Sequence, residues 1–403
     1  MNCRSCGSTQ FQSILNLGLQ PWCGDLIEET MLGSEKTYPL HLIYCQDCEL
    51  LQLDHTVPKE TMFLEHKYLS GTTKSLREHF LGLASENKRE FELREDDIVV
   101  DIGGNDGTQM IQYQKIGLTN CWNIESATKI AQISQDSGVN TISDFFNEAC
   151  ARTNFEEGSV KLINASGVFF HLEELHSVIR GIKYLLKQDG VFIVQFMYAG
   201  AMIDNNNFDT IYHEHLCYYT LRSLQKLLQP YGLEVFDAYK VPIHSGTVVA
   251  KIAHTNSANM EKTERYHQTL KEDQKYTLES YLKFAETVVS KKDELRRFLR
   301  SLKANDKTIY AYGAPAKGNT LLNYFKIDKK LIDKCVEINE LKVGYYLPES
   351  HIPIILESEE DLPDYYLLLS HNFATEIINK NKDVIRKGTR FIIPFPEIQV
   401  VGV

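Results

Sequence analysis

The 403-residue sequence has no long run of apolar residues. A helix that crosses a bilayer needs about 18 or more of them in succession, and no stretch approaches that length. Positive charge is also scarce, because 43 Lys and Arg stand against 54 Asp and Glu, for a formal net charge of -11. This balance excludes a non-specific nucleic-acid binder and a protein held on an anionic membrane, since both depend on Lys and Arg. It leaves room for a local basic pocket that binds a diphosphate.

The first six residues, from Met1 to Cys6, lack the apolar segment of a secretory signal. The nine cysteines are an odd number, which together with the missing signal favours reduced thiols in the cytosol. We therefore expect a cytoplasmic protein whose partners include neither a membrane nor a nucleic acid. A hydrophobic fraction of 43% allows each domain to bury a core of its own.

Four cysteines form two CxxC pairs, Cys3 with Cys6 and Cys45 with Cys48. Two such turns can present four thiolates to one Zn²⁺, in the tetrahedral shell that zinc favours. A closed shell of four sulfurs leaves no position for a catalytic water, so we expect a structural zinc in a segment too small to bury its own core. A redox dithiol, disulfides or unrelated thiols are the alternatives.

Alternating strand and helix signals begin near residue 97. The sequence predicts strands over 97–102, 121–125, 160–165 and 190–196 with helices between them, which is typical of a parallel sheet covered on both faces. A second, smaller α/β unit is predicted after residue 306, with strands near 308–312, 331–338, 352–355, 365–369 and 390–394. The region 61–95 looks helical, and 255–303 has one apolar stripe that predicts a connecting helix: Leu278, Tyr281, Leu282, Ala285, Val288, Leu295 and Leu299.

The first of these strands ends in a glycine turn that starts at Asp101. Gly103 and its neighbours let the backbone approach a ligand at the carboxyl edge of the sheet. Glu125 ends the next strand, where a carboxylate can accept hydrogen bonds from both ribose hydroxyls. A dinucleotide site favours GxGxxG, whereas this turn reads GGNDG, and Asn105 and Asp106 suit a ligand with an ammonium group, such as S-adenosylmethionine. A plain strand-to-helix turn is the alternative.

Two further residues complete the predicted cofactor site. The segment 144–147 could contact the adenine through polar groups and through the ring of Phe146, although two adjacent Phe residues are more often part of a core. Ser166 follows the strand over 160–165, and we expect it to contact the cofactor as well.

The segment 212–215 reads Tyr-His-Glu-His and follows the predicted strand over 190–196. In a parallel α/β sheet this region overhangs the ligand edge, and these side chains can serve as acid, base and orienter in proton transfer. The spacing is not HExxH, which excludes a zinc protease. His171 opens the helix after the strand over 160–165 and can point into the same cleft. Histidines that are exposed, or satisfied in a core, are the alternative.

A second glycine turn runs from Tyr312 through Gly313 and Lys317 to Asn319. It resembles a phosphate-binding turn without matching GxxxxGK[ST]. Lys317 is placed where it could neutralise a diphosphate. The alternative is a plain turn with a surface lysine.

In this order, the motifs resemble those of the sugar C-methyltransferase family, the C-3 methyltransferases of branched deoxysugar biosynthesis. The resemblance covers essentially the whole chain and rests most on segments 212–215 and 313–319, together with the CxxC pairs, the turn over 101–107 and the block over 344–354. It implies three parts: a zinc-binding domain (1–60), an S-adenosylmethionine-binding methyltransferase domain (61–254) and a C-terminal Rossmann-like domain (304–403). The helical connection predicted from the apolar stripe (255–303) lies between the last two.

The same resemblance implies roles for individual residues. His215 is similar to the base that removes a proton from the sugar carbon, with Tyr212 and Glu214 beside it. His171 and Tyr68 are similar to further residues of the cleft, Tyr68 on the side of the cofactor. A sugar nucleotide would lie between the methyltransferase and C-terminal domains, and its expected contacts are Tyr312, Gly313, Lys317 and Asn319. One segment departs from the family: its His-Gly-Gly-Ser-Leu-Arg run reads His-Ser-Gly-Thr-Val-Val over 244–249, without the Arg.

The resemblance therefore implies an S-adenosylmethionine-dependent enzyme that methylates C-3 of a nucleotide-linked keto-deoxysugar through an enolate. We expect a monomer or a small homo-oligomer. The alternatives are an NAD-dependent nucleotide-sugar oxidoreductase, an O- or N-methyltransferase that acts on a sugar, and a zinc-containing interaction module on a degenerate methyltransferase.

Overall fold

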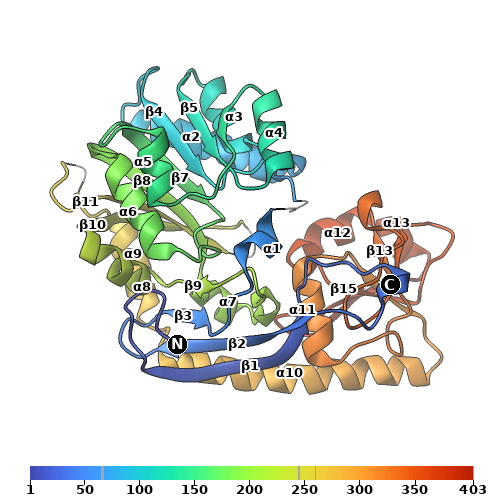
Figure 1. Cartoon of the computed structure of the whole chain (residues 1–403). Coiled ribbons are helices and arrows are strands. Elements are labelled where there is room, and N and C mark those ends of the chain that lie inside the picture. Colours follow the sequence, from blue (N-terminus) through green and yellow to red (C-terminus); the bar gives the residue numbers. More distant parts are fainter. Residues whose placement is uncertain (65–67, 244–245, 259, 403) are drawn as a thin grey trace.

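The computed structural model describes residues 1–64, 68–243, 246–258 and 260–402, and three β-sheets with their helices account for most of them (Figure 1). The predicted α/β class is confirmed by the parallel sheets of the second and third units. Among the described residues, no helix has both the length and the apolar character that a membrane span requires.

The first sheet is antiparallel and has the strand order β1-β2-β3-β9. Its strands are β1 (Phe11–Pro21), β2 (Thr37–Cys45), β3 (Leu51–Leu53) and β9 (Cys217–Tyr218). The fourth strand thus comes from the middle of the chain, immediately after His215, and joins the segment 212–215 to the N-terminal sheet. The short helix α1 (Lys59–Phe63) follows this sheet.

The central sheet has seven strands in the order β10-β11-β8-β7-β4-β5-β6. They are β4 (Ile98–Ile102), β5 (Cys121–Ile124), β6 (Asn140–Ile142), β7 (Val160–Ser166), β8 (Leu186–Met197), β10 (Leu233–Val241) and β11 (Thr247–His254). The strands from β8 to β6 in this order are parallel, and β11 and β10 are antiparallel additions. The strand order reverses between β4 and β7, and in such sheets a ligand binds at the carboxyl ends beside that point.

Successive strand residues point to opposite faces of the central sheet, and both faces are buried under helices. Val99 packs with α2 and α3 on one face, and Val100 packs with α5 and α6 on the other. The helices of this unit are α2 (Lys74–Glu90), α3 (Thr108–Lys115), α4 (Thr128–Asp136), α5 (Glu148–Asn154), α6 (Leu175–Leu185), α7 (Ala199–Asp204) and α8 (Leu221–Leu228). The predicted helical region 61–95 therefore contains the last residues of α1 and all of α2.

The third sheet has the order β14-β13-β12-β15-β16-β17 and is parallel except for its last strand. The strands are β12 (Ile309–Tyr312), β13 (Lys334–Glu337), β14 (Ile354–Leu356), β15 (Tyr365–Leu368), β16 (Arg390–Ile393) and β17 (Gln399–Val401). Its helices are α11 (Ala316–Phe325), α12 (Ala374–Lys380) and α13 (Lys382–Arg386). The first strand of the unit lies in the middle, as in a Rossmann fold.

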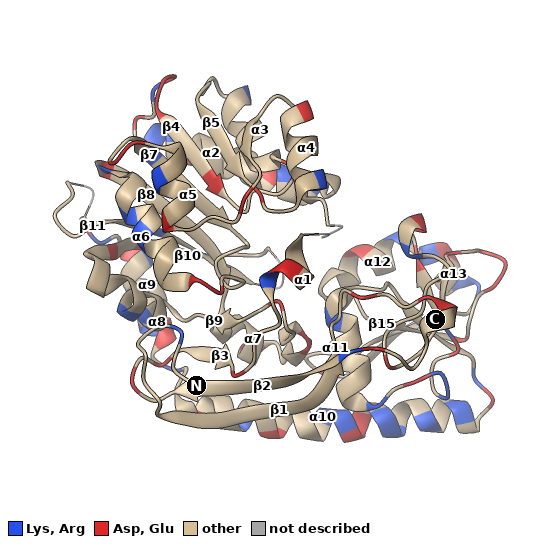
Figure 2. Ribbon diagram, viewed as in Figure 1, with Lys and Arg blue, Asp and Glu red and all other residues tan. Residues whose placement is uncertain are grey.

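Two helices, α9 (Glu264–Asp273) and α10 (Leu278–Ala304), occupy the region predicted as one connection. At about 1.5 Å per residue, the 27 residues of α10 span about 40 Å. The helix packs against β1, α7 and α11 and so contacts all three units. Its buried stripe corrects the prediction at one position: Leu282 is 37% exposed, and Phe284 is buried in its place. Both acidic and basic residues lie along α10, and its C-terminal part carries Lys and Arg without Asp or Glu (Figure 2).

Candidate active site

The cysteines of the two CxxC pairs come together beside the first sheet. Their four Sγ atoms lie within 4.8 Å of one another, with 3.5 Å between Cys3 and Cys48 and 3.6 Å between Cys6 and Cys45. In a tetrahedral site with Zn–S bonds of about 2.3 Å, the sulfurs are about 3.8 Å apart, so these four thiols fit a zinc ion. All nine cysteines of the chain are free thiols, which leaves no disulfide among them.

The glycine turn between β4 and α3 lies at the carboxyl edge of the central sheet. Gly103 and Gly107 have φ angles of 64° and 77°, a region that glycine adopts without strain. Gly104 has no room for a side chain, because a Cβ there would lie 2.3 Å from Oδ1 of Asn123 and 2.6 Å from Oδ2 of Asp101. Backbone alone therefore occupies these three positions at the edge where a ligand would bind.

Two buried carboxyl groups, Asp101 and Glu125, lie beside this turn. Glu125 accepts hydrogen bonds from the backbone N–H of Asn105 at 3.0 Å and of Ala127 at 2.8 Å. Burial raises the pKa of Glu125, and burial together with the charge of Glu125 raises the pKa of Asp101 well above its usual range. Oδ1 of Asp101 is buried and has no hydrogen-bond partner among the described residues. Acceptors of this kind fit the ammonium group and the ribose hydroxyls of S-adenosylmethionine.

Asn105 and Asp106 hold a neighbouring segment rather than standing open at the turn. Oδ1 of Asn105 accepts the backbone N–H of Ser70 at 2.9 Å, and its Nδ2 donates to the carbonyl of Tyr68 at 3.0 Å. Oδ2 of Asp106 accepts the backbone N–H of Gly71 at 2.8 Å. The two side chains thus hold the segment 68–71 across the turn. Tyr68, the first residue of this segment, is 44% exposed. Their predicted contact with an ammonium group stays a prediction.

The two remaining cofactor candidates lie in different surroundings. The ring of Phe146 is buried against α6, close to Gly181, so it is a core residue, and Phe145 is the partly exposed member of the pair. The predicted contact of Phe146 with the adenine stays a prediction. Ser166 ends β7 with a buried Oγ that has no hydrogen-bond partner among the described residues. Its predicted contact with the cofactor stays a prediction.

His215 is buried in the segment between α7 and β9, and its Nδ1 lies 2.7 Å from the carbonyl oxygen of Thr210. A carbonyl only accepts hydrogen bonds, so Nδ1 carries a proton, and in the neutral form of the imidazole the lone pair is then on Nε2. The ring of Tyr212 lies 3.8 Å from the His215 ring, centroid to centroid, and Phe170 meets it edge-on at 4.8 Å. The backbone thus fixes the tautomer in which Nε2 can accept a proton.

His171 belongs to the same cluster. Its ring centroid is 5.0 Å from that of His215, and its Nδ1 donates to the backbone carbonyl of Glu214 at 2.5 Å. The ring of Phe63, at the end of α1, meets His171 edge-on at 5.4 Å. The structure therefore brings together His171, Tyr212, Glu214 and His215, as the sequence predicted from their positions after two parallel strands, and α1 adds Phe63 to this cluster.

Glu214 points toward the N-terminal sheet, where its Oε1 accepts the indole N–H of Trp22 at 2.9 Å. Burial raises the pKa of Glu214 to about 7. Burial and the nearby charge of Glu214 also raise the pKa of Tyr212 well above its usual range, so the Tyr212 hydroxyl stays protonated at neutral pH. His213 lies apart from this group: its Nε2 is 3.3 Å from the carbonyl of Tyr38, and burial lowers its pKa to about 4.

The second glycine turn lies at the carboxyl ends of β12, β13 and β15, next to a cavity of about 230 Å³. Tyr312, Gly313, Glu337 and Lys342 are among the residues that line it. The hydroxyl of Tyr312 donates to Oε1 of Glu357 at 2.5 Å. The turn is closed by Glu337, whose Oε2 accepts the backbone N–H of Ala314 at 2.9 Å. Tyr312 and Gly313 thus lie at the edge where a ligand of this unit would bind.

Lys317 and Asn319 face inward from α11. Nζ of Lys317 lies 3.9 Å from Oδ2 of the buried Asp209, so this lysine has an acidic partner in the central unit. It is therefore not the surface lysine of a plain turn, which was the alternative prediction. Nδ2 of Asn319 donates to the carbonyl of Cys23 at 2.7 Å, which ties α11 to the N-terminal sheet. The predicted contacts of both residues with a sugar nucleotide stay predictions.

Reasoning from the sequence missed two residues of this region, Trp22 and Asp209. Trp22 is one of only two tryptophans and lies between the CxxC pairs, which was a weak signal. Asp209 is a single acidic residue in a polar loop and gave none. The family segment 244–249 lies partly outside the described residues, which resume at Gly246.

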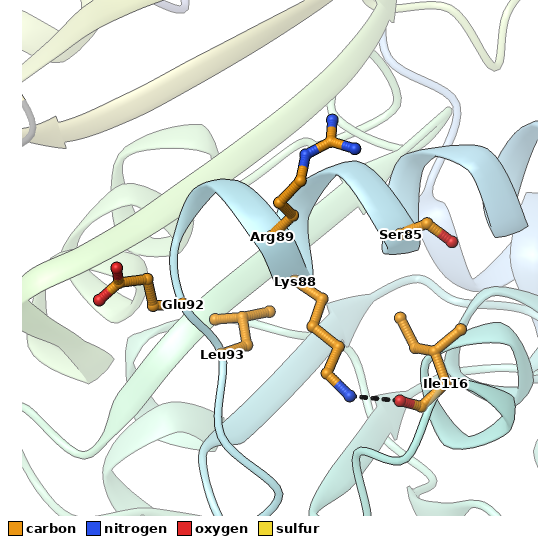
Figure 3. A pocket seen from close by; sticks show the side chains of 6 residues that line it. All are labelled: Ser85, Lys88, Arg89, Glu92, Leu93 and Ile116. Atoms are coloured by element: carbon orange, nitrogen blue, oxygen red, sulfur yellow. Dashed lines mark hydrogen bonds between the residues drawn. The ribbon is translucent and has the colours of Figure 1, made fainter.

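A second pocket, of about 590 Å³, lies along the C-terminal part of α2 (Figure 3). It is lined by Ser85, Lys88, Arg89, Glu92, Leu93 and Ile116, and Nζ of Lys88 donates to the backbone carbonyl of Ile116. Its lining contains none of the predicted site residues.

Three family models match the chain in succession. The "Putative zinc binding domain" model matches residues 3–63, the "Methyltransferase domain" model matches 76–238, and the "C-methyltransferase C-terminal domain" model matches 242–396. The chain is also similar to the C-methyltransferase NovU of Streptomyces niveus. The two are 32% identical over 407 residues, which cover 99% of this chain and 96% of that protein.

Two solved structures are similar to part of the chain. A SAM-dependent methyltransferase from Aquifex aeolicus is 15% identical, with a TM-score of 0.35, over 46% of this chain and 98% of that one. The YcgJ protein from Bacillus subtilis is 18% identical, with a TM-score of 0.34, over 41% of this chain and 73% of that one. The matches to the family models and to NovU identify the chain as an S-adenosylmethionine-dependent methyltransferase with a zinc-binding N-terminal domain, and they show that it belongs to the sugar C-methyltransferase family.

Proposed function

We propose that the enzyme methylates C-3 of a nucleotide-linked 4-keto-deoxysugar through an enolate, with His215 as the general base. The observation that carries this proposal is the hydrogen bond from Nδ1 of His215 to the carbonyl of Thr210. It keeps the lone pair on Nε2, the nitrogen that would take the proton from the sugar carbon.

Methylation at carbon needs a carbanion-like nucleophile, and a ketone next to the reacting carbon makes its proton acidic by spreading the charge onto oxygen. A hydrogen-bond donor at that oxygen stabilises the enolate, as in an oxyanion hole. We assign this donor to the hydroxyl of Tyr212, whose ring lies beside that of His215 and whose raised pKa keeps the hydroxyl protonated. S-adenosylmethionine supplies, when bound, a methyl group on a positively charged sulfur that the enolate carbon can attack.

The nucleotide part of the substrate is assigned to the C-terminal unit. The cavity beside Tyr312 and Gly313 lies at the carboxyl ends of a parallel sheet in Rossmann order, where such folds bind nucleotides. Lys342 lines this cavity and could supply positive charge toward a diphosphate. The sugar would then reach from this unit toward His215.

Solvent exchange tests the proposal. Wild-type enzyme incubated with the keto sugar in deuterium oxide should incorporate deuterium at C-3, and His215→Ala should lose that exchange together with turnover. His213→Gln is the matched control, because His213 belongs to the same segment but packs against Tyr38. Exchange at the wild-type rate in His215→Ala would remove His215 from the role of base. Methylation of a hydroxyl or amino group without any exchange at carbon would instead identify an O- or N-methyltransferase.

A further inference from the structure

Three ionisable side chains lie between the central and C-terminal units, the buried Asp209 and His371 and the partly buried Lys317, and the mechanism above does not use them as a group. Asp209 is fully buried in the 3-10 helix η3 (Phe208–Thr210). Its Oδ2 accepts a hydrogen bond from Nε2 of His371 at 2.7 Å and lies 3.9 Å from Nζ of Lys317. His371 begins the 3-10 helix η6 (His371–Phe373), and Lys317 is on α11, so both come from the C-terminal unit.

The three groups depend on one another electrostatically. Burial alone would raise the pKa of Asp209, but the charges of His371 and Lys317 hold it below its usual range. Burial lowers the pKa of Lys317, and the charge of Asp209 opposes that effect. Buried ion pairs add little to stability, since each charge has to leave water, and apolar residues often pack there equally well. A role in fixing the geometry of η3 accounts better for such a group than a role in stability.

Apolar contacts already attach η3 to the C-terminal unit. The ring of Phe208 stacks on Phe325 with centroids 4.8 Å apart, and Phe395 meets it edge-on at 5.6 Å. Such contacts are strong but tolerate small shifts and rotations, whereas a hydrogen bond to a carboxylate is directional. The contact between Asp209 and His371 therefore defines the orientation of η3 that these apolar contacts alone leave open.

The orientation of η3 matters because its last residue holds the general base. Thr210 follows Asp209 directly, and its carbonyl oxygen accepts the Nδ1 proton of His215. The Thr210 hydroxyl donates to the carbonyl of Asn207 at 2.7 Å, which closes the turn on itself. One short, hydrogen-bonded turn thus connects the carboxylate of Asp209 with the imidazole of His215.

We infer that Asp209, held by His371 and Lys317, is a positioning residue that orients η3 so that the Thr210 carbonyl keeps His215 protonated on Nδ1. The inference rests on the proposed function, in which His215 is the base. It makes the C-terminal unit a part of the catalytic apparatus as well as a binding unit, because that unit supplies both partners of Asp209.

Two substitutions at His371 and one at Asp209 test the inference. His371→Leu and Asp209→Asn should lower kcat about 10- to 100-fold with little change in KM, since a misplacement near 1 Å can cost about 100-fold. His371→Gln is the matched control, because its amide N–H can take the place of Nε2, and it should stay close to wild type. Calorimetry with S-adenosylmethionine should give the same affinity for all three variants, which shows that the cofactor site is intact.

The second measurement is the tautomer of His215, read from two-bond ¹H–¹⁵N correlations of the imidazole and assigned by comparison with His215→Ala. Wild type and His371→Gln should show the proton on Nδ1, and His371→Leu and Asp209→Asn should show a shift toward Nε2. An unchanged tautomer in His371→Leu would overturn the inference. If Asp209→Asn does not fold, the comparison of His371→Leu with His371→Gln is sufficient for the test. A shifted tautomer together with normal deuterium exchange in His215→Ala would support the positioning role and refute the proposed base.

Discussion

Trp22 donates its indole N–H to the carboxyl group of Glu214 at 2.9 Å, although 192 residues separate them. The zinc-binding segment therefore supplies a direct hydrogen bond to the segment that holds His215. Burial raises the pKa of Glu214 to about 7, and the Trp22 hydrogen bond acts in the opposite direction, because it stabilises the ionised form.

This pair leads to a prediction about the pH dependence of stability. Between the ordinary pKa of about 4.5 and the folded value of about 7, the folded chain binds more protons at Glu214 than the unfolded chain does. The free energy of unfolding should therefore fall as the pH rises through this window, by at most about 3 kcal/mol from this group. Glu214→Gln should lack that component, which urea unfolding of both proteins at about pH 5 and pH 8 would measure.

In Trp22→Phe, the decrease in the free energy of unfolding should continue to higher pH, because the ionised carboxyl group of Glu214 loses its hydrogen-bond donor. Trp122→Phe is the matched control, since Trp122 donates to Asn120 in the central unit. Equal pH dependence in wild type and Glu214→Gln would show that Glu214 is ionised throughout the range, contrary to the expectation.

A second prediction concerns the metal. Purified protein should contain close to one equivalent of zinc, and Cys48→Ser should lose most of it and unfold at a lower temperature, because the four thiolates hold a segment with little core of its own. Metal analysis and thermal unfolding measure both effects. Cys150→Ser, at a buried thiol in α5, should keep its zinc. Full zinc content in Cys48→Ser would argue against the four-sulfur site.

A third prediction concerns the cofactor turn. Gly104→Ala should weaken S-adenosylmethionine binding at least tenfold, because its Cβ would lie 2.3 Å from Oδ1 of Asn123 and force the turn to move. Titration calorimetry measures the affinity. Gly82→Ala should bind normally, since nothing lies within 4 Å of a Cβ at that position of α2. Wild-type affinity in Gly104→Ala would place the cofactor away from this turn.

A fourth prediction concerns α10. Leu295 is buried on the face that packs against the other units, so Leu295→Ala should lower the free energy of unfolding by about 2–5 kcal/mol. Leu282→Ala, at the exposed position of the same helix, should change it by less than about 1 kcal/mol. Denaturant titrations of the two variants compare these values. Similar losses for both would mean that the helix packs on a different face.

The sequence predicted the elements whose signals are local. The strand β4, which contains Val99 and Val100, is a nearly continuous apolar run because both sheet faces are covered, and such a run is visible without a structure. The short strands β6 and β9 could not be located in this way, since three or two residues give no period and their pairing depends on distant partners. The sequence also predicts a single connection over 255–303, whereas this region folds into two helices, α9 and α10.

The same distinction between local signals and distant contacts applies to the residues of the candidate site. Asp101, Glu125 and the segment 212–215 could be named because each lies at or beyond the carboxyl end of a strand of a parallel sheet, where side chains gather at one edge. Lys317 shows the limit of this reasoning: its place after a strand suggested a ligand contact, but its burial and its acidic partner arise only when two units pack together. Trp22 likewise becomes part of the site only through a contact across the sequence.

The strand β9 has a practical consequence for anyone who wishes to dissect this enzyme. Residues 217 and 218 complete a sheet that begins at residue 11, and only one residue separates them from the imidazole at position 215. A fragment that begins at α1 would lack β3, the strand that pairs with β9. It would also lack the Trp22 indole that donates a hydrogen bond to Glu214. The methyltransferase unit should therefore not work as a detachable module, and engineering that swaps N-terminal units between relatives has to carry β9 with them.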